Sequence, residues 1–421
     1  MTLELARPRE STAAAAPARG ASWIDRAARR AVCDRLAGLR GGHLRIREAN
    51  GETGFGPAGS DLRATVVVRD PAFWTAVALR GSVGAGESYV DGHWTCDDLT
   101  ALVRILVRDR TTLEHVETGL ARLAAPLLRL GHALRRNTRE GSRRNIAAHY
   151  DVGNDFYALW LDESLMYSCA VFDDPEATLE QAQSAKNERL CRMLRLSRGE
   201  HLLEIGTGWG GFAMHAASRF GCRVTTATIS RAQRDLAVER IARAGLAGRV
   251  EVLLCDYRDL AGRYDKLVSI EMIEAVGHEY LDGYFAACAR LLRPGGAMAL
   301  QSITIRDELY DKARRSVDFI QQHVFPGCSI PSLAALRGSA ARGGGLEVAA
   351  AHEIGPHYAT TLRLWRERFR ARRADIEALG HGERFARLWE YYFCYCEGGF
   401  EEGQIGDVQL LLRSRPGRTP G

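Results

Sequence analysis

The sequence predicts an α/β protein with a doubly wound, mostly parallel sheet of seven strands and a smaller α+β domain before it. Three observations predict this class. Apolar strand-like segments alternate with helix-like segments in the second half of the chain, a glycine-rich turn follows the first of these strands, and the N-terminal part has strands and helices of its own. The 421 residues, 46% hydrophobic and 26% charged, suffice for two or three globular domains and exclude a largely disordered or collagen-like chain.

We expect three parts along the chain. Residues 1–20 are rich in Ala, Pro and Arg and are expected to be disordered. Residues 21–140 are predicted to form the N-terminal domain, and residues 146–414 the larger domain, with a polar linker near 137–145. In the N-terminal domain the pattern predicts a helix at 22–39, strands at 43–48 and 63–69, a glycine-rich segment at 81–94 and a helix from about Asp97.

The net charge of +5 is concentrated in one stretch. The segment from Arg104 to Arg144 contains ten arginines and four acidic residues. Such a stretch suits an anionic membrane surface or nucleic acid, but by itself a solvated helix face is the first interpretation. No apolar run is long enough to span a membrane, and no convincing signal peptide begins the chain. The ten cysteines form no CxxC pair, which argues against a disulfide framework or a metal site and makes the cytoplasm the default compartment.

The second half shows clear element boundaries. Thr178 and Gln181 form a capping-box pattern at the start of a helix, and Gly221 ends another. The strands are predicted at 201–205, 222–229, 249–254, 266–271 and 296–303, with a late pair at 346–354 and 407–413. Residues 304–345 show little regular pattern and are interpreted as an insertion, a candidate lid.

The run Glu204-Ile-Gly-Thr-Gly-Trp-Gly-Gly211 lies between a strand and a helix, where glycines allow a sharp turn and close approach of a ligand. A dinucleotide site and a methyltransferase loop both need weighing. Glu204, placed to face an ammonium group, favours the second, as does the absence of an acidic residue after the next strand. There Gln233 either holds a nucleoside or caps a helix with Ser230, and the two interpretations are equally weighted.

Polar residues also follow the later strands. Asp256 is placed to accept from an adenine amino group, or equally to cap the next turn. Tyr167-Ser168-Cys169 precedes the sheet, Glu271-Met-Ile-Glu274 follows the fourth strand, and Gln301-Ser-Ile303 ends the fifth. Cys396 lies on a late aromatic helix, where a small buried hydrophobic residue is the favoured interpretation of a lone thiol. Taken by itself, Glu274 is equally well explained as an acidic residue that interacts with the dipole at a helix N-terminus.

These segments together resemble a known family. The stretch HYDVGNDFYALWLDESLMYSCA at 149–170, then EIGTGWGG, TISRAQ, CDYRDL, SIEMIEAVG, FPGCSIPS, HYATTL and YYFCYCEGGF, resemble cyclopropane-fatty-acyl-phospholipid synthases in order, over about residues 146–412. The segment at 81–94 resembles the N-terminal domain of that family, which is related to the mycolic acid cyclopropane synthases. The resemblance implies an S-adenosylmethionine-dependent methyltransferase that acts on a cis double bond in a phospholipid acyl chain and forms a cyclopropane ring.

The resemblance also implies site residues. With the glycine loop, the cofactor site would comprise Tyr167, Ser168, Glu204, Gly206, Gly208, Trp209, Gly210, Thr228, Gln233, Asp256 and Tyr257. Cys169, Glu274, Gln301, Ile303 and Tyr358 match positions that hold a bicarbonate ion, which would take a proton from a carbocation, and Cys396 matches a cysteine near the reacting centre. Many members of the family have His where Gln301 and Ala275 stand in this sequence. Thr207 stands where the family often has Cys or Gly. Gln301 can still donate to an anion but cannot titrate.

Partners and location follow as expectations. The 21–140 domain is expected to be membrane-associated, and the protein to be cytoplasmic and peripheral on the inner membrane face, with unsaturated phospholipid acyl chains as substrate. No nucleic acid partner is expected, and a homodimer is left open. The alternatives are a related lipid C-methyltransferase that gives a methyl-branched or methylene fatty acid, a small-molecule N- or O-methyltransferase, and a non-catalytic membrane-binding protein.

Overall fold

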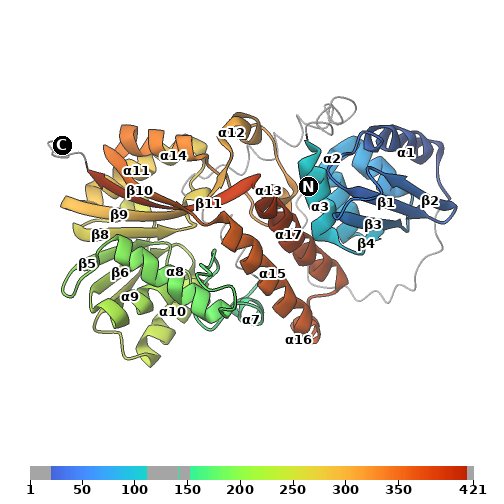
Figure 1. Ribbon diagram of the computed structural model, residues 1–421. Coiled ribbons are helices and arrows are strands. Elements are labelled where there is room, and N and C mark those ends of the chain that lie inside the picture. The colour runs from blue at the N-terminus through green and yellow to red at the C-terminus, as the bar shows by residue number, and fades with distance from the viewer. Residues whose placement is uncertain (1–19, 111–140, 142–151, 415–421) are drawn as a thin grey trace. The chain divides into compact units, whose positions relative to one another are not determined.

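The computed structural model describes residues 20–110, 141 and 152–414 (Figure 1). The chain divides into two compact units, Met1–Leu127 with Arg366–Glu402, and Leu128–Trp365 with Gly403–Gly421. The expected disorder of residues 1–20, apart from Gly20, lies outside the described residues, as do the linker apart from Gly141 and most of the basic stretch. Among the described helices, none combines the length and apolar character that crossing a membrane requires.

The first unit contains a four-stranded sheet in the order β2-β1-β3-β4, with β1 and β3 parallel and the other pairs antiparallel. Its strands are β1 (His43–Glu48), β2 (Gly51–Phe55), β3 (Arg63–Val68) and β4 (Trp94–Cys96), and its helices are α1 (Trp23–Leu36), α2 (Ala72–Val90), α3 (Leu99–Arg108), α16 (Arg373–Ala378) and α17 (Glu383–Glu401). The predicted strands are present. Most of the glycine-rich 81–94 segment lies in α2, whose backbone leaves the helical conformation at Gly81, with φ of 54°.

The second unit contains a seven-stranded sheet in the order β10-β11-β9-β8-β5-β6-β7. The strands are β5 (His201–Ile205), β6 (Arg223–Thr228), β7 (Val250–Leu254), β8 (Tyr264–Ile270), β9 (Leu292–Ile305), β10 (Leu346–Glu353) and β11 (Ile405–Ser414). The five strands from β9 to β7 are parallel, and β11 pairs antiparallel with both β9 and β10. The predicted fold class is therefore confirmed.

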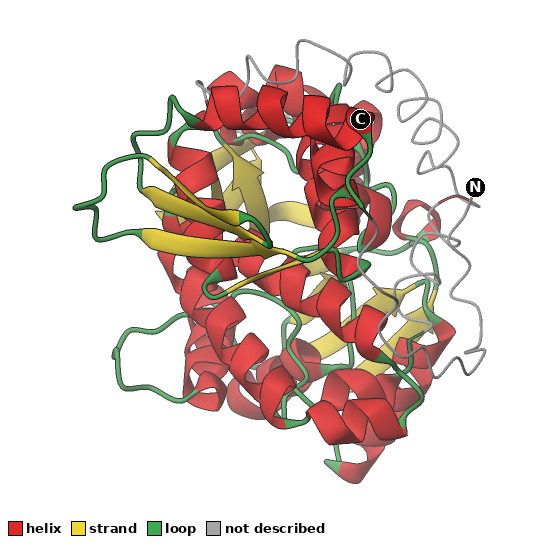
Figure 2. Ribbon diagram, turned by 90° about the vertical axis from the view of Figure 1, so that its right-hand side faces the viewer, coloured by secondary structure: helices red, strands yellow, loops and turns green. Residues whose placement is uncertain are grey.

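Helices cover both faces of this sheet (Figures 1 and 2). Two separate buried cores show the division: α8, α9 and α10 contribute to one, and α11 and α14 to the other. The helices are α7 (Asn154–Ala158), α8 (Leu179–Met193), α9 (Gly211–Phe220), α10 (Arg231–Arg243), α11 (Leu281–Leu291), α12 (Asp307–Ala313), α13 (Phe319–His323) and α14 (Leu333–Ser339). Helix α15 (Gly355–Ala371) begins in this unit, and its residues from Arg366 on belong to the first. The Thr178 capping box is present, and Gly221 ends α9 in the left-handed conformation.

Two segment predictions need correction. Residues 304–345 hold α12, α13 and α14 rather than an irregular insertion, and Leu336 of α14 is fully buried in the core beside α11. The predicted domain at 146–414 is interrupted, because residues 366–402 belong to the first unit. The physical reason is that α17 is bonded to that unit: Arg387 donates to the carbonyl oxygens of Tyr89 and Trp94.

Candidate active site

The glycine loop joins β5 to α9 at the carboxyl edge of the parallel strands. Gly206, Gly208 and Gly210 have φ of 101°, 51° and 86°, a region that other residues rarely adopt. A Cβ on Gly206 would also lie 3.2 Å from Cβ of Met272. The loop therefore requires glycine at these positions for its own conformation.

Glu204 lies on β5 just before this loop and is 2% exposed. Burial raises the pKa of its carboxyl group to about 8, although Thr226 and Lys186 act in the opposite direction. Its Oε2 atom has no hydrogen-bond partner among the described residues. A buried carboxyl oxygen of this kind is satisfied by a cationic ligand group, which agrees with the predicted ammonium contact.

The turns after β6 and β7 are organised by side chains. The Thr228 hydroxyl donates to Oε1 of Gln233 at 2.9 Å, and the Gln233 N–H donates to Oγ of Ser230 at 3.3 Å. The Ser230 side chain thus caps α10, as in the capping interpretation, while the nucleoside role of Gln233 stays a prediction. The Asp256 carboxylate accepts two hydrogen bonds from the Arg258 guanidinium and one from the Arg258 backbone N–H, as in the capping interpretation.

Aromatic side chains line the segment before the sheet. The Tyr167 ring lies 5.4–5.5 Å from the ring centroids of Tyr157, Trp160 and Trp365. Trp209 of the glycine loop packs on Tyr157 and donates from Nε1 to Asn154 at 2.7 Å. Further along the sheet edge, Tyr257 packs edge-on against Tyr284 at 5.3 Å. These rings form an apolar lining for the predicted cofactor side.

Ser168 is linked to a buried cation. Its Oγ accepts from Nζ of Lys186 at 2.8 Å, and burial lowers the pKa of that lysine to about 8. The charges of Glu271, Asp162 and Asp407 raise the Lys186 pKa in opposition to burial. Lys186 therefore connects the predicted cofactor residue Ser168 with a group of carboxylates.

Of these carboxylates, Glu271 directly follows β8 and Asp407 lies near the start of β11, and Glu271 is the centre of a group of hydrogen bonds. Its Oε1 accepts from the Cys169 N–H at 2.8 Å and from Nε2 of Gln301 at 2.8 Å, and its Oε2 accepts from the Tyr358 hydroxyl at 2.7 Å. Its φ is +47°, unusual for a residue with a side chain. Three residues that the sequence assigned to an ion thus converge on Glu271, which the sequence analysis did not single out.

Glu274 lies beside this group and is 8% exposed. Its Oε1 accepts from the Ile303 N–H at 2.7 Å and the Ser302 hydroxyl at 3.0 Å, while Oε2 has no hydrogen-bond partner among the described residues. Burial first, and then the charge of Glu271, raise the pKa of Glu274 to about 8. Glu274 and Ile303 are therefore together, as predicted, with Glu274 mostly protonated near neutral pH.

Cys396 lies on α17 in the first unit, so its predicted role near the reacting centre stays a prediction. It is partly exposed, and the aromatic helix is organised around other side chains: Trp389 packs against Phe385 and Tyr392.

Cys169, by contrast, is fully buried, and its thiol donates to the carbonyl oxygens of Ala170 and Ile354. Burial raises the thiol pKa of Cys169 well above its ordinary value, so the residue contributes its backbone N–H rather than a thiolate.

Comparison with known proteins identifies the family. A family model described as mycolic acid cyclopropane synthetase matches residues 137–410. The chain belongs to this family. It is 40% identical over 399 residues to tuberculostearic acid methyltransferase UfaA1 of Mycobacterium tuberculosis, with 93% of each chain covered. It is 37% identical over 358 residues to cyclopropane-fatty-acyl-phospholipid synthase of Escherichia coli, with 84% of this chain and 87% of the relative covered.

Solved structures agree with this assignment. Mycolic acid cyclopropane synthase CmaA1, complexed with SAH and CTAB, superposes with a TM-score of 0.60 at 31% identity and covers 64% of this chain and 97% of that one. The protein is an S-adenosylmethionine-dependent methyltransferase of the cyclopropane synthase family. The site residues fit this cofactor: the three glycines keep the loop clear, and the unpartnered Glu204 oxygen is suited to its ammonium group.

A bicarbonate ion, in contrast, does not fit the residues expected to hold it. The Cys169 N–H, the Gln301 amide and the Tyr358 hydroxyl already donate to the Glu271 carboxylate. An additional anion would lose these donors and would sit beside a negative charge that already raises the pKa of Glu274 and Asp407.

Proposed function

We propose that this protein transfers a methyl group from S-adenosylmethionine to the cis double bond of an unsaturated phospholipid acyl chain and closes a cyclopropane ring. The observation that carries the proposal is the presence, in one unit, of the glycine loop and of a largely buried cluster of polar groups centred on Glu271. Two relatives that align over most of the chain are named tuberculostearic acid methyltransferase and cyclopropane-fatty-acyl-phospholipid synthase, and these names support a lipid substrate.

The reaction makes two demands on the chain. When bound, S-adenosylmethionine supplies an electrophilic methyl group on a sulfonium sulfur. Because an alkene is a weak nucleophile, the protein must align it and exclude water, which contributes about 7–11 kcal/mol in favourable intramolecular cases. The carbocation that follows is stabilised by aromatic faces, each by roughly 0.5–2 kcal/mol. Tyr167 and Tyr358, each packed against Trp365, provide such faces.

A second product is favoured by one comparison. The relative with 40% identity is called a methyltransferase rather than a cyclopropane synthase. A hydride shift before proton loss would convert the same carbocation into a methylene branch, and later reduction would give a methyl branch. Both outcomes need a proton acceptor near the new methyl group, so the site serves either.

We also propose that the protein works at the cytoplasmic membrane face as a peripheral protein. The support is the basic stretch between Arg104 and Arg144, of which residues 104–110 and 141 are described. There, Arg104 and Arg108 are paired with Glu402, so the charges of these two side chains are already compensated within the chain.

Transfer of labelled methyl groups to vesicles tests the function. Purified protein is incubated with S-adenosylmethionine carrying a 13C-methyl group and with monounsaturated vesicles of anionic or zwitterionic phospholipid. We expect acyl chains enlarged by one CH2 unit, with ring or methylene signals distinguished by NMR, and faster transfer on anionic vesicles. Gly206→Val, which places a side chain at a strained position beside Met272, is the inactive control. Unlabelled lipid despite normal SAH binding would contradict the proposal.

A further inference from the structure

We propose that the side-chain carboxylate of Glu271 is the proton acceptor of this reaction, so that the chain carries its own base in place of a bicarbonate ion. The inference rests on the proposed function, because it concerns the proton lost after methyl transfer. It assigns a catalytic role to a residue that neither the family resemblance nor the motif spacing pointed to.

Three hydrogen-bond donors converge on the Glu271 carboxylate. The Cys169 N–H, the Gln301 amide and the Tyr358 hydroxyl come from three separate parts of the second unit, and all reach Glu271 within 2.7–2.8 Å. The orientation of the Gln301 amide is set by Gln409, whose Nε2 donates to Oε1 of Gln301 at 2.9 Å. Nε2 of Gln301 must then point to Glu271. A carboxylate with its lone pairs held in this way is a fixed acceptor, as a bound anion would be.

The backbone conformation of Glu271 also points to a functional role. A residue with a side chain at φ of +47° persists where the surrounding structure determines its conformation, and such residues cluster at functional sites. Here the Glu271 N–H donates to the Gln301 carbonyl oxygen at 2.9 Å, which holds the residue at the end of β8. The strained conformation turns the side chain toward the three donors. Glycine would relieve the strain but would remove the carboxylate that these donors share.

The charges around Glu271 are unevenly distributed. Burial and the charge of Glu271 raise the pKa of Asp407 well above its ordinary value, and the pKa of Glu274 is raised as well. Both neighbours therefore tend to keep their protons, while Lys186 supplies the opposing positive charge. Of the three carboxyl groups, Glu271 is the one that retains partial exposure, so a substrate can reach it.

The π electrons of the double bond form a bond to the methyl carbon, and the sulfur keeps the electron pair of the broken S–C bond. One C–H bond of the new methyl group then breaks: its electron pair closes the ring on the cationic carbon, and its proton goes to the Glu271 carboxylate. A proton next to a carbocation is strongly acidic, so a hydrogen-bonded carboxylate is basic enough. The neutral Glu271 afterwards returns the proton to solvent.

Two substitutions at Glu271 distinguish this base from an ion. Glu271→Gln keeps the volume but removes the negative charge, and we expect turnover to fall at least about 100-fold, whether or not bicarbonate is added. Glu271→Gly suits the positive φ and frees the three donors, and we expect a similar loss that added bicarbonate reverses by at least about tenfold. Turnover of the unsubstituted protein should be the same in CO2-free and bicarbonate buffers. Glu239→Gln, at an exposed ion pair on α10, is the matched control.

Bicarbonate binding provides a readout that does not need catalysis. The 13C-bicarbonate signal should broaden with Glu271→Gly, and not with the unsubstituted protein or with Glu271→Gln. SAH affinity and the melting temperature show that each variant is folded. The proposal is overturned if the unsubstituted protein binds or needs bicarbonate, or if Glu271→Gln keeps full turnover. Failure of the proposed function is a different result, an absence of labelled lipid with any variant, and the binding data still decide which group occupies the site.

Discussion

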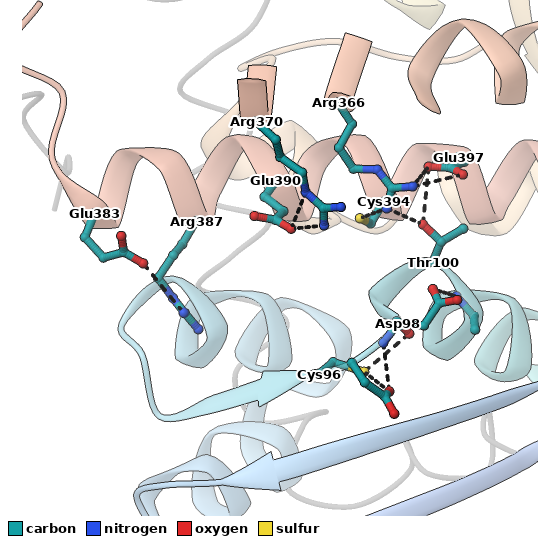
Figure 3. Close-up of polar contacts among 12 residues, drawn as sticks. Cys96, Asp98, Thr100, Arg366, Arg370, Glu383, Arg387, Glu390, Cys394 and Glu397 are labelled. Carbon is teal, nitrogen blue, oxygen red and sulfur yellow. Dashed lines mark hydrogen bonds and ion pairs between the residues drawn. The ribbon is translucent and has the colours of Figure 1, made fainter. Parts of the chain in front are cut away.

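Each unit of the protein buries a polar cluster, and the two clusters treat charge differently. In the first unit Arg366 pairs with Glu397 at 3.1 Å and also donates to Thr100 and Cys394 (Figure 3). In the second, among the described residues, the charges of Glu271, Asp162 and Asp407 act on Lys186, and burial raises the pKa values of Asp162 and Asp407. A cluster that serves stability pairs a cation with an anion. A cluster with excess carboxyl groups holds protons instead, as an acid–base site requires.

The largest effect is expected from breaking the paired cluster. Glu397→Ala leaves the Arg366 guanidinium, 13% exposed, without its carboxylate, so we expect the free energy of unfolding to fall by about 3–5 kcal/mol. Urea unfolding followed by fluorescence measures it. Glu390→Ala, on the same helix, removes the partner of the more exposed Arg370 and should cost less than about 1 kcal/mol. Equal losses in the two variants would show that the first cluster is not the stabilising one.

A smaller effect, of opposite sign, is expected from Glu274→Gln. The folded-state pKa of Glu274 is about 8 and its ordinary value is 4.5, so folding favours the protonated form. The stability contributed by this group is complete below pH 4.5 and is lost as the pH rises through 8. Because Gln cannot ionise, the variant should gain stability relative to the unsubstituted protein as the pH rises through this range, with a slope of at most about 1.4 kcal/mol per pH unit. Melting temperatures across the pH range test this; a difference independent of pH would refute it.

The smallest effect is expected from Tyr358→Phe. It removes one of three donors to Glu271 and leaves the ring on Trp365, so turnover should fall about tenfold, or about 1.4 kcal/mol in the barrier. SAH affinity and melting temperature should not change, in contrast to Glu397→Ala. Tyr264→Phe, whose hydroxyl donates to Ala261 away from the site, is the control. A loss of stability in place of turnover would make the second cluster structural too.

The reach of the sequence can be followed residue by residue. Gly206, Gly208 and Gly210 were predictable because a positive φ is a property of the residue itself. The capping roles of Thr178 and Ser230 were predictable because each acts on an N–H three residues away. Glu271 escaped notice although it lies in the same motif as Glu274, because its meaning depends on donors 30, 87 and 102 residues away.

The order of strands and helices, the glycine loop and the type of fold followed from the sequence by itself, since periodicity, turn conformation and capping are short-range properties. Tertiary structure alone decided that residues 366–402 join the first unit and that Glu271 receives the hydrogen bonds expected for an ion. The physical reason is that a hydrogen-bond acceptor is chosen by distance and direction in space. Segments that are remote along the chain supply the competing groups, and only the folded sheet brings them within reach.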